Sequence, residues 1–152
     1  MYRKILVLLD GSELSEKVLP HIKNLAKGGE SEIILYRVCE PPVILADYPA
    51  DLRTAWEDHV RQETSHIQEQ CRIYLDDVQG KLAKSGLKVT VAAGVGKAPE
   101  QIVDFAVQNG ADVIVMASHG RSGIARWAYG STADRVLKSS PIPVLLIKSK
   151  EL

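Results

Sequence analysis

KILVLLDGS, residues 4–12, is an apolar run that ends in an acidic residue and a glycine. Short runs of this kind, rich in β-branched residues, are typical of strands that are buried on both faces. Four similar runs follow, so we predict strands at residues 5–9, 32–38, 87–92, 112–117 and 144–147. Strands that are nearly continuously apolar indicate a parallel sheet covered by helices, rather than an antiparallel sheet with one exposed face.

Helical patterns separate these runs. Apolar residues recur at three- and four-residue spacing in residues 14–26 and 102–107. The longest such segment, from about residue 52 to about residue 85, carries one apolar stripe and predicts a single long amphipathic helix. Pro99 suits the first turn of a helix, whereas Pro20 lies inside the first pattern and should bend that helix.

The alternation of strands and helices predicts an α/β fold, a doubly wound five-stranded parallel sheet with helices on both faces. Right-handed crossovers leave few ways to wind this order of elements, and we predict strand order 3-2-1-4-5. The winding direction then reverses between the first and fourth strands, so a ligand crevice should open beyond their carboxyl ends. There, Asp10 would lie beside Ser118, His119 and Gly120, with residues 40–51 and 119–129 as walls.

Length and composition are those of an ordinary globular protein. The 152 residues, 45% hydrophobic and 25% charged, predict one domain over residues 1–152. Nineteen basic and nineteen acidic residues cancel, so no long-range field would attract nucleic acid, and we expect no nucleic-acid partner. No apolar run approaches the ~20 residues of a membrane helix. The N-terminus has no small-residue cleavage site after its apolar run, so we expect a cytoplasmic protein.

The cysteines and two of the histidines suggest no metal or redox chemistry. Cys39 and Cys71 are far apart in the sequence and form no C-x-x-C pair, so we predict buried thiols rather than a zinc site or a redox motif. His59 and His66 lie seven residues apart on the predicted long helix, which is too few ligands for a metal. We expect both at the surface.

The most informative stretch is ASHGRSGIARWAYGST, residues 117–132, between the fourth strand and the last helix. Glycines let backbone N–H groups approach a phosphate, and a helix N-terminus offers further donors at the positive end of its dipole. The alternative is a plain connection, in which Ser131 is the N-cap and Asp134 completes a capping box. Spacing alone leaves both possibilities open.

The sequence does not match the standard motifs of phosphate-binding loops, dinucleotide-binding folds or serine hydrolases. A Walker A loop ending at Lys97 would need glycine at Val91 and a hydroxyl residue at Ala98. Neither glycine-rich segment, 94–96 or 117–123, satisfies the dinucleotide fingerprint. The G-x-S-x-G pattern of serine hydrolases has Ile124 in its last position.

The sequence resembles the universal stress protein family over essentially the whole chain. The resemblance rests on residues 4–12, on ADVIVM at 111–116 and on SPIPVLLIK at 140–148. In the family's nucleotide-binding branch the loop has a glycine, two residues, a glycine, nine residues, and then glycine with Ser or Thr. Here Gly120, Gly130 and Ser131 fit that motif, while Ala117 replaces the first glycine. Alanine is the smallest such change, and a strand end needs no positive φ.

The resemblance implies an adenine-nucleotide site. Adenine would be held by backbone groups near Val38, and ribose would lie near Asp10 and the loop at residues 93–97. The phosphates would meet Gly120, Gly130 and Ser131. The predicted binding residues are Asp10, Val38, Gly94, Lys97, Ala117, His119, Gly120, Arg121, Gly130, Ser131 and Thr132.

Several of these residues also have a structural explanation. Asp10 could cap the following helix together with Ser12, and Lys97 could be a solvated loop charge. Arg121, like Arg126, could neutralise phosphates or point to water. His119 has no assigned orienting acid, so we predict no catalytic residue.

The function that the resemblance implies is a cytoplasmic, homodimeric, ATP-binding stress or signalling module with little or no turnover. AMP or ADP would bind more weakly, and Mg²⁺ or Mn²⁺ would assist at the phosphates. The dimer would pair the last strand, residues 144–147, because an apolar edge strand needs a cover. Two alternatives stay open. One is a nucleotide-free dimeric interaction module, and the other is a weak ATP hydrolase or nucleotidyl-transfer enzyme of adenine-nucleotide α-hydrolase architecture, whose H-I-G-H and S-G-G-x-D-S signatures are absent.

Overall fold

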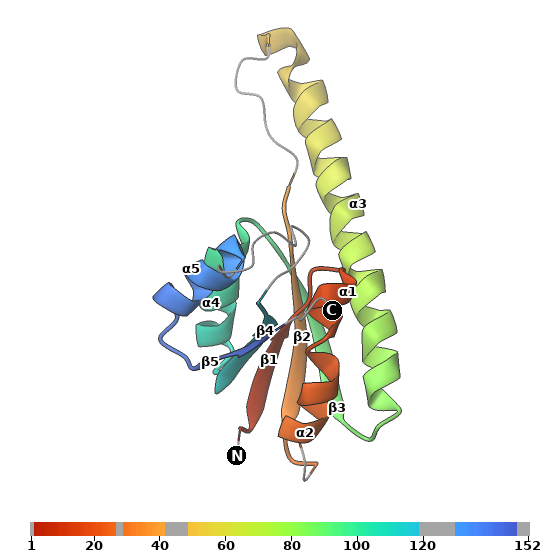
Figure 1. Ribbon diagram of the computed structural model, residues 1–152. Coiled ribbons are helices and arrows are strands. Elements are labelled where there is room, and N and C mark those ends of the chain that lie inside the picture. Colours follow the sequence, from red (N-terminus) through yellow and green to blue (C-terminus); the bar gives the residue numbers. More distant parts are fainter. Residues whose placement is uncertain (1, 27–28, 42–48, 119–129, 149–152) are drawn as a thin grey trace.

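The computed structural model describes residues 2–26, 29–41, 49–118 and 130–148. Its strands form one five-stranded parallel sheet in the order β3-β2-β1-β4-β5, as Figure 1 shows. The strands are β1 (Lys4–Leu8), β2 (Glu32–Cys39), β3 (Lys88–Val95), β4 (Val113–Ala117) and β5 (Val144–Ile147). The predicted fold class and strand order are confirmed.

Helices cover both faces of the sheet, so the sheet is doubly wound. The helices are α1 (Glu13–Glu16), α2 (Leu19–Leu25), α3 (Ala50–Ala83), α4 (Ala98–Gln108) and α5 (Ser131–Ser139). The first three pack on one face and α4 and α5 on the other (Figure 1). Right-handed crossovers place successive helices in this way once the winding reverses at β1.

The two faces carry two separate cores, and alternate residues of each strand point into each core. In β1, Ile5 and Val7 face α1, α2 and α3, whereas Leu6 and Leu8 face α4 and α5. Residues 5–8 are at most 7% exposed, which is why β1 carries no polar side chain after Lys4. The sheet centre is therefore apolar on both sides, as the near-continuous apolar runs predict.

Pro20 interrupts the first helical segment rather than bending it. The expected helix over residues 14–26 is divided into α1, which ends at Glu16, and α2, which begins at Leu19. Proline lacks an N–H, and its ring clashes with the carbonyl of the residue four positions earlier, here Glu16. At the second position of α2, Pro20 needs no intrahelical donor and is accommodated.

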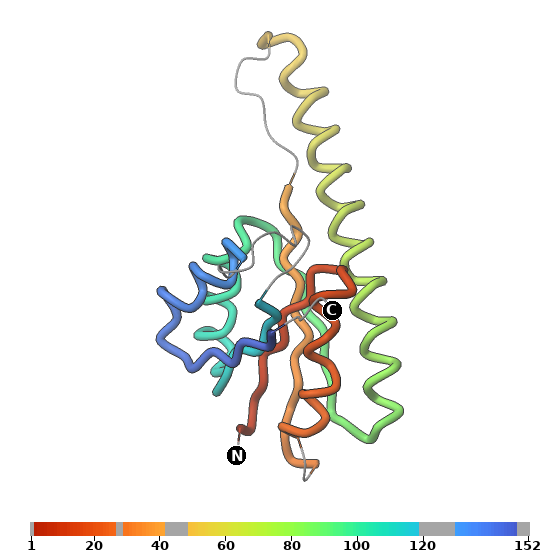
Figure 2. The backbone as a smooth tube through the Cα atoms, viewed as in Figure 1, coloured from red at the N-terminus to blue at the C-terminus, as the bar shows by residue number. Residues whose placement is uncertain are grey.

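The long helix α3 extends well beyond the sheet. Its 34 residues span about 50 Å at 1.5 Å per residue, whereas the eight residues of β2 span only about 26 Å. Its buried residues, Cys71, Leu75, Val78 and Leu82, all lie in the C-terminal half. The N-terminal half projects away from the body of the molecule (Figures 1 and 2). Among the described helices, none is long and apolar enough to cross a membrane.

The expectation of two buried thiols is wrong. Cys39 at the end of β2 and Cys71 in α3 are joined by a disulfide, with their Cα atoms 6.8 Å apart. Both residues are buried, as predicted, but α3 crosses the sheet so that Cys71 faces the end of β2. A separation of 32 residues gives no sign of this contact in the sequence.

Candidate functional site

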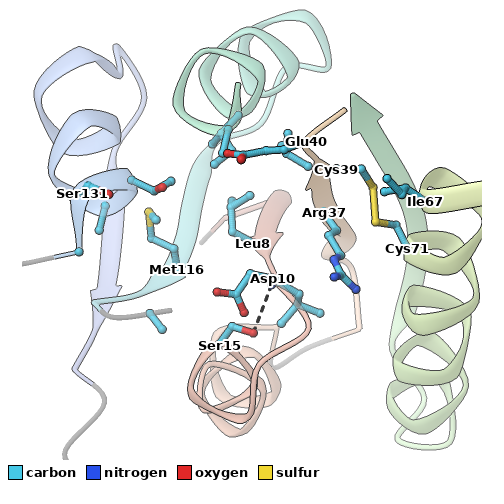
Figure 3. Close-up of a pocket in the computed structure, with 18 of the residues that line it drawn as sticks. Leu8, Asp10, Ser15, Arg37, Cys39, Glu40, Ile67, Cys71, Met116 and Ser131 are labelled. Atoms are coloured by element: carbon cyan, nitrogen blue, oxygen red, sulfur yellow. Dashed lines mark hydrogen bonds between the residues drawn. A yellow bond between two sulfur atoms is a disulfide. The ribbon is translucent and has the colours of Figure 1, made fainter. Parts of the chain in front are cut away.

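A pocket of about 620 Å³ opens at the carboxyl ends of β1, β2 and β4. This is the position at which the direction of winding reverses, and where open α/β sheets bind ligands. Figure 3 shows side chains from the two helical layers converging on it. Six of the predicted residues line it: Asp10, Val38, Ala117, Gly130, Ser131 and Thr132.

Two predicted residues do not line the pocket. Gly94 pairs with Val38 in the β2–β3 ladder, but a Cβ at Gly94 would clash with the Tyr36 hydroxyl oxygen. Gly94 therefore makes room for the Tyr36 ring, which stacks on Phe105 at a centroid distance of 4.1 Å. Lys97 is the exposed residue before α4. Of the other predicted residues, His119, Gly120 and Arg121 lie outside the described part of the chain, and so does Arg126.

Asp10 belongs to a polar turn between β1 and α1. Its carboxylate accepts a hydrogen bond from the Ser12 N–H at 2.9 Å, and its own N–H donates to the Ser15 hydroxyl at 3.3 Å (Figure 3). Ser12 is the N-cap of α1, since its hydroxyl accepts from the Ser15 N–H. Ser12 thus provides the cap, while Asp10 accepts a hydrogen bond from the Ser12 backbone and also lines the pocket.

The N-terminus of α5 forms the opposite side of the pocket. Gly130 is the N-cap, and no side chain caps the helix. The capping box considered as an alternative is absent, because Ser131 is already helical and the Asp134 carboxylate binds Lys138 at 2.8 Å. Backbone N–H groups of a first helical turn have no intrahelical acceptor, so they are suited to an anionic group. The residues of that turn, Ser131, Thr132 and Ala133, line the pocket.

Ala117, which departs from the family's glycine motif, is the last residue of β4. It is 7% exposed and belongs to the core that faces α1, α2 and α3, while it also lines the pocket. Its methyl group therefore has apolar neighbours in the core. A small side chain here is compatible with both the packing and the pocket.

Sequence reasoning missed residues on the α3 side of the pocket. Arg37, His66 and Gln70 line it, together with the Cys39–Cys71 disulfide. Glu40 also lines it and belongs to the segment 40–51 that was predicted as a wall. His66 is exposed, as expected, but it faces the pocket as well. Arg37 had a detectable signal, because it is the only charge within the run from Ile33 to Cys39.

Arg37 is part of a polar chain that connects β2, α3 and α1. Its guanidinium lies 5.1 Å from the centroid of the Tyr74 ring, and the Tyr74 hydroxyl donates to Glu16 at 2.8 Å. Burial and the bond to Glu16 raise the pKa of Tyr74 well above its ordinary value. Gly11 adopts φ +85°, and a Cβ there would approach the Arg37 Nη1 to 2.9 Å. The positive φ favours glycine here, because residues with a Cβ rarely adopt it.

Among the described residues, no group of three His, Cys, Asp or Glu side chains could hold a metal ion. Mg²⁺ is commonly bound by one or two carboxylates together with ligand phosphates. Asp10 and Glu40 are the carboxylates that line the pocket. They fit a cation that is brought by a phosphorylated ligand.

The fold and the pocket define a doubly wound α/β protein with a pocket at the switch point of its sheet. The chain belongs to the universal stress protein family, whose model matches residues 1–148. It is similar to the universal stress protein MJ0577 of Methanocaldococcus jannaschii, with 31% identity over 99% of this chain and 97% of that protein. The solved structure of MJ0577 superposes with a TM-score of 0.85 over 100% of this chain and 99% of that one, at 30% identity.

Two more distant solved structures share the fold. One is a family member from Arabidopsis thaliana with AMP bound, at 18% identity, a TM-score of 0.65, and coverage of 97% of this chain and 92% of that one. The other is a universal stress protein in complex with cAMP, at 18% identity, a TM-score of 0.59, and coverage of 98% of both chains.

Proposed function

We propose that this protein binds ATP in the pocket at the ends of β1, β2 and β4, and binds ADP and AMP more weakly. The observation that carries the proposal is the meeting of Asp10, Val38 and the Gly130–Thr132 turn around one cavity. The volume, about 620 Å³, lies within the range of small-molecule sites. The adenine nucleotides held by the Arabidopsis protein and by the cAMP complex support the same ligand class here.

The base and ribose would occupy the side of the pocket formed by β1 and β2. Val38 is the penultimate residue of β2, and its backbone could read the adenine edge, as the family resemblance implies. Leu8, Ile102 and Met116 supply apolar surface for a flat ring. Asp10 is the acceptor available to ribose hydroxyls. Guanine reverses the donor and acceptor pattern of adenine, so GTP should bind less tightly.

The phosphates would approach the first turn of α5. That turn offers backbone donors and the positive end of a nine-residue helix. His119, Gly120 and Arg121 are further proposed contacts. Mg²⁺ or Mn²⁺ would be shared between the phosphates and a pocket carboxylate.

The proposed role is a single-domain, cytoplasmic, homodimeric stress or signalling module in which nucleotide occupancy changes stability or partner contacts. Little or no turnover is expected. ATP hydrolysis usually needs a group that positions the attacking water in addition to charge stabilisation, and the sequence assigns no general base.

The test is a calorimetric titration of the purified protein with ATP, ADP, AMP and GTP in the presence of Mg²⁺. Saturable heat for ATP, with a rise in melting temperature, is the expected result. Mass spectrometry of any ligand retained during purification is an independent check. An absence of both saturable heat and thermal stabilisation with every adenine nucleotide would reject the proposal in favour of a nucleotide-free module.

A further inference from the structure

The disulfide Cys39–Cys71 forms part of the pocket wall. Both cysteines line the cavity, and Figure 3 shows the bond bridging the end of β2 and α3 beside Ile67. Each cysteine is 3% exposed, so the cavity is the nearby open space from which a small molecule can reach the sulfurs. The bond therefore belongs to the site and not to the outer surface.

The disulfide also marks the boundary between the packed and the projecting halves of α3. Cys71 is the first buried residue of this helix, and the next ones are Leu75, Val78 and Leu82. Before Cys71, α3 contributes Ile67, His66 and Gln70 to the pocket, and none of these three side chains is buried. The covalent bond is thus the firmest attachment of this part of the wall to the sheet.

We propose that Cys39–Cys71 is a thiol–disulfide exchange site that accepts electrons from a small dithiol, and that its reduction weakens nucleotide binding. The coupling to the nucleotide rests on the function proposed above. Without the bond, the segment of α3 before Cys71 is held to the end of β2 by partly exposed side chains only. The wall can then move outward, and the nucleotide loses surface contact on this side.

The exchange is a two-electron reaction. A thiolate of the dithiol attacks one cysteine sulfur, which breaks the protein S–S bond, forms a mixed disulfide and releases the other cysteine as a thiolate. The second thiol of the reductant closes on the mixed disulfide and releases the second cysteine. The dithiol leaves as a cyclic disulfide, and its two protons end on Cys39 and Cys71. In a reducing compartment such a bond is typically transient and redox-sensing.

Coupling between two sites is reciprocal. If the disulfide favours nucleotide binding, bound nucleotide must favour the disulfide to the same extent. A nucleotide in the pocket would also obstruct the approach of the dithiol to the sulfurs. ATP with Mg²⁺ should therefore slow reduction by dithiothreitol and shift the equilibrium toward the oxidised form.

The first experiment counts thiols. Protein purified without reductant is denatured and alkylated, and its mass is compared with that of protein treated first with dithiothreitol. We expect no alkylated cysteine before reduction and two after it. Two free thiols in the untreated protein would overturn the inference, whatever the protein does with nucleotides.

The second experiment measures ATP affinity in the oxidised protein, in the reduced protein and in the variant Cys39→Ser/Cys71→Ser. We expect binding at least about fivefold weaker in the last two forms, the lower end of typical couplings. Reoxidation should restore the affinity, and dithiothreitol should not change the variant. If the variant does not fold, the ATP affinity of the reduced wild-type protein tests the coupling. Circular dichroism then shows whether the reduced protein is folded. Equal affinity in both redox states overturns the coupling alone, whereas no binding in either state overturns the proposed function and the coupling together.

Discussion

The backbone N–H of Gly130 donates to the carbonyl oxygen of Ser118 at 2.8 Å. Ser118 follows β4 directly, and its own N–H donates to Ile147 of β5 at 2.8 Å. The start of α5 is therefore attached by backbone hydrogen bonds to the carboxyl ends of β4 and β5. This attachment aims the first turn of α5 into the pocket at the end of β1.

The first prediction concerns Gly130. Its φ of −54° is open to any residue, so Gly130→Val should keep the fold, at a helix-capping cost of about 1 kcal/mol. The branched side chain would occupy the space in front of the N–H groups of Ser131 and Thr132. We expect ATP affinity to fall at least tenfold, about 1.4 kcal/mol, in a calorimetric titration.

Ala117→Gly is the companion variant, because it restores the family's glycine. It should bind ATP equally or more tightly. If the Gly130→Val variant binds ATP within about threefold of wild type, the phosphates lie elsewhere. If this variant loses its circular dichroism signal, Gly130 is needed for the backbone conformation and not for the ligand.

A second prediction concerns the β5 edge. Val144–Ile147 are all partly exposed, although they are apolar and continue a buried sheet. Pairing with the same strand of a second copy would satisfy the edge and cover these side chains. We expect a dimer in light scattering at micromolar concentration, and a monomer for Leu146→Lys. Val107→Lys is the matched control, since Val107 is 52% exposed on α4 and should leave the dimer intact. A monomeric wild-type protein would exclude this assembly.

The third prediction separates the structural role of Gly94 from its suggested ligand role. Gly94→Ala would force the new Cβ against the Tyr36 hydroxyl, so we expect a loss of about 1–3 kcal/mol of stability by urea denaturation. Gly80→Ala is the control, because Gly80 lies in α3 with nothing within 4 Å of its Cβ position. It should gain about 0.5–1 kcal/mol. If Gly94→Ala lost only nucleotide affinity and no stability, the ligand role would be right.

The fourth prediction concerns acid stability. The Asp112 carboxylate accepts hydrogen bonds from the N–H groups of Lys4 and Arg3, both at 2.8 Å, and these bonds hold its pKa below the ordinary value. A lowered folded-state pKa stabilises the protein above the unfolded-state pKa of about 3.9, and this stabilisation disappears as the pH falls through the folded-state pKa.

Asp112→Asn should therefore be less stable than wild type at neutral pH, and the difference should shrink as both proteins are acidified toward about pH 2. Urea denaturation of the two proteins across this pH range measures the effect. A stability difference that does not depend on pH would mean that the charge of Asp112 contributes nothing at the start of β1.

Much of the fold follows from local patterns. The strands around Ile5, Ile33 and Val113 are apolar on both faces, so neither face can be exposed to solvent and helices must cover both. The right-handedness of the crossover connections then limits the strand order. The glycine and hydroxyl residues at Gly130 and Ser131 likewise indicate a helix start, and α5 begins at Ser131. These features depend on neighbours in the chain, which is why the sequence alone determined them.

The tertiary structure decided which distant residues meet. Cys71 reaches Cys39, and His66 and Gln70 reach the pocket, only because α3 packs Leu75 and Val78 against the sheet and continues past its edge. Gly94 lies against the ring of Tyr36, two residues before its ladder partner Val38, and does not line the pocket. Packing among residues that are far apart in the sequence sets the angle of a helix across a sheet and decides which side chain fills each space. The hydrophobic periodicity of the sequence predicts neither.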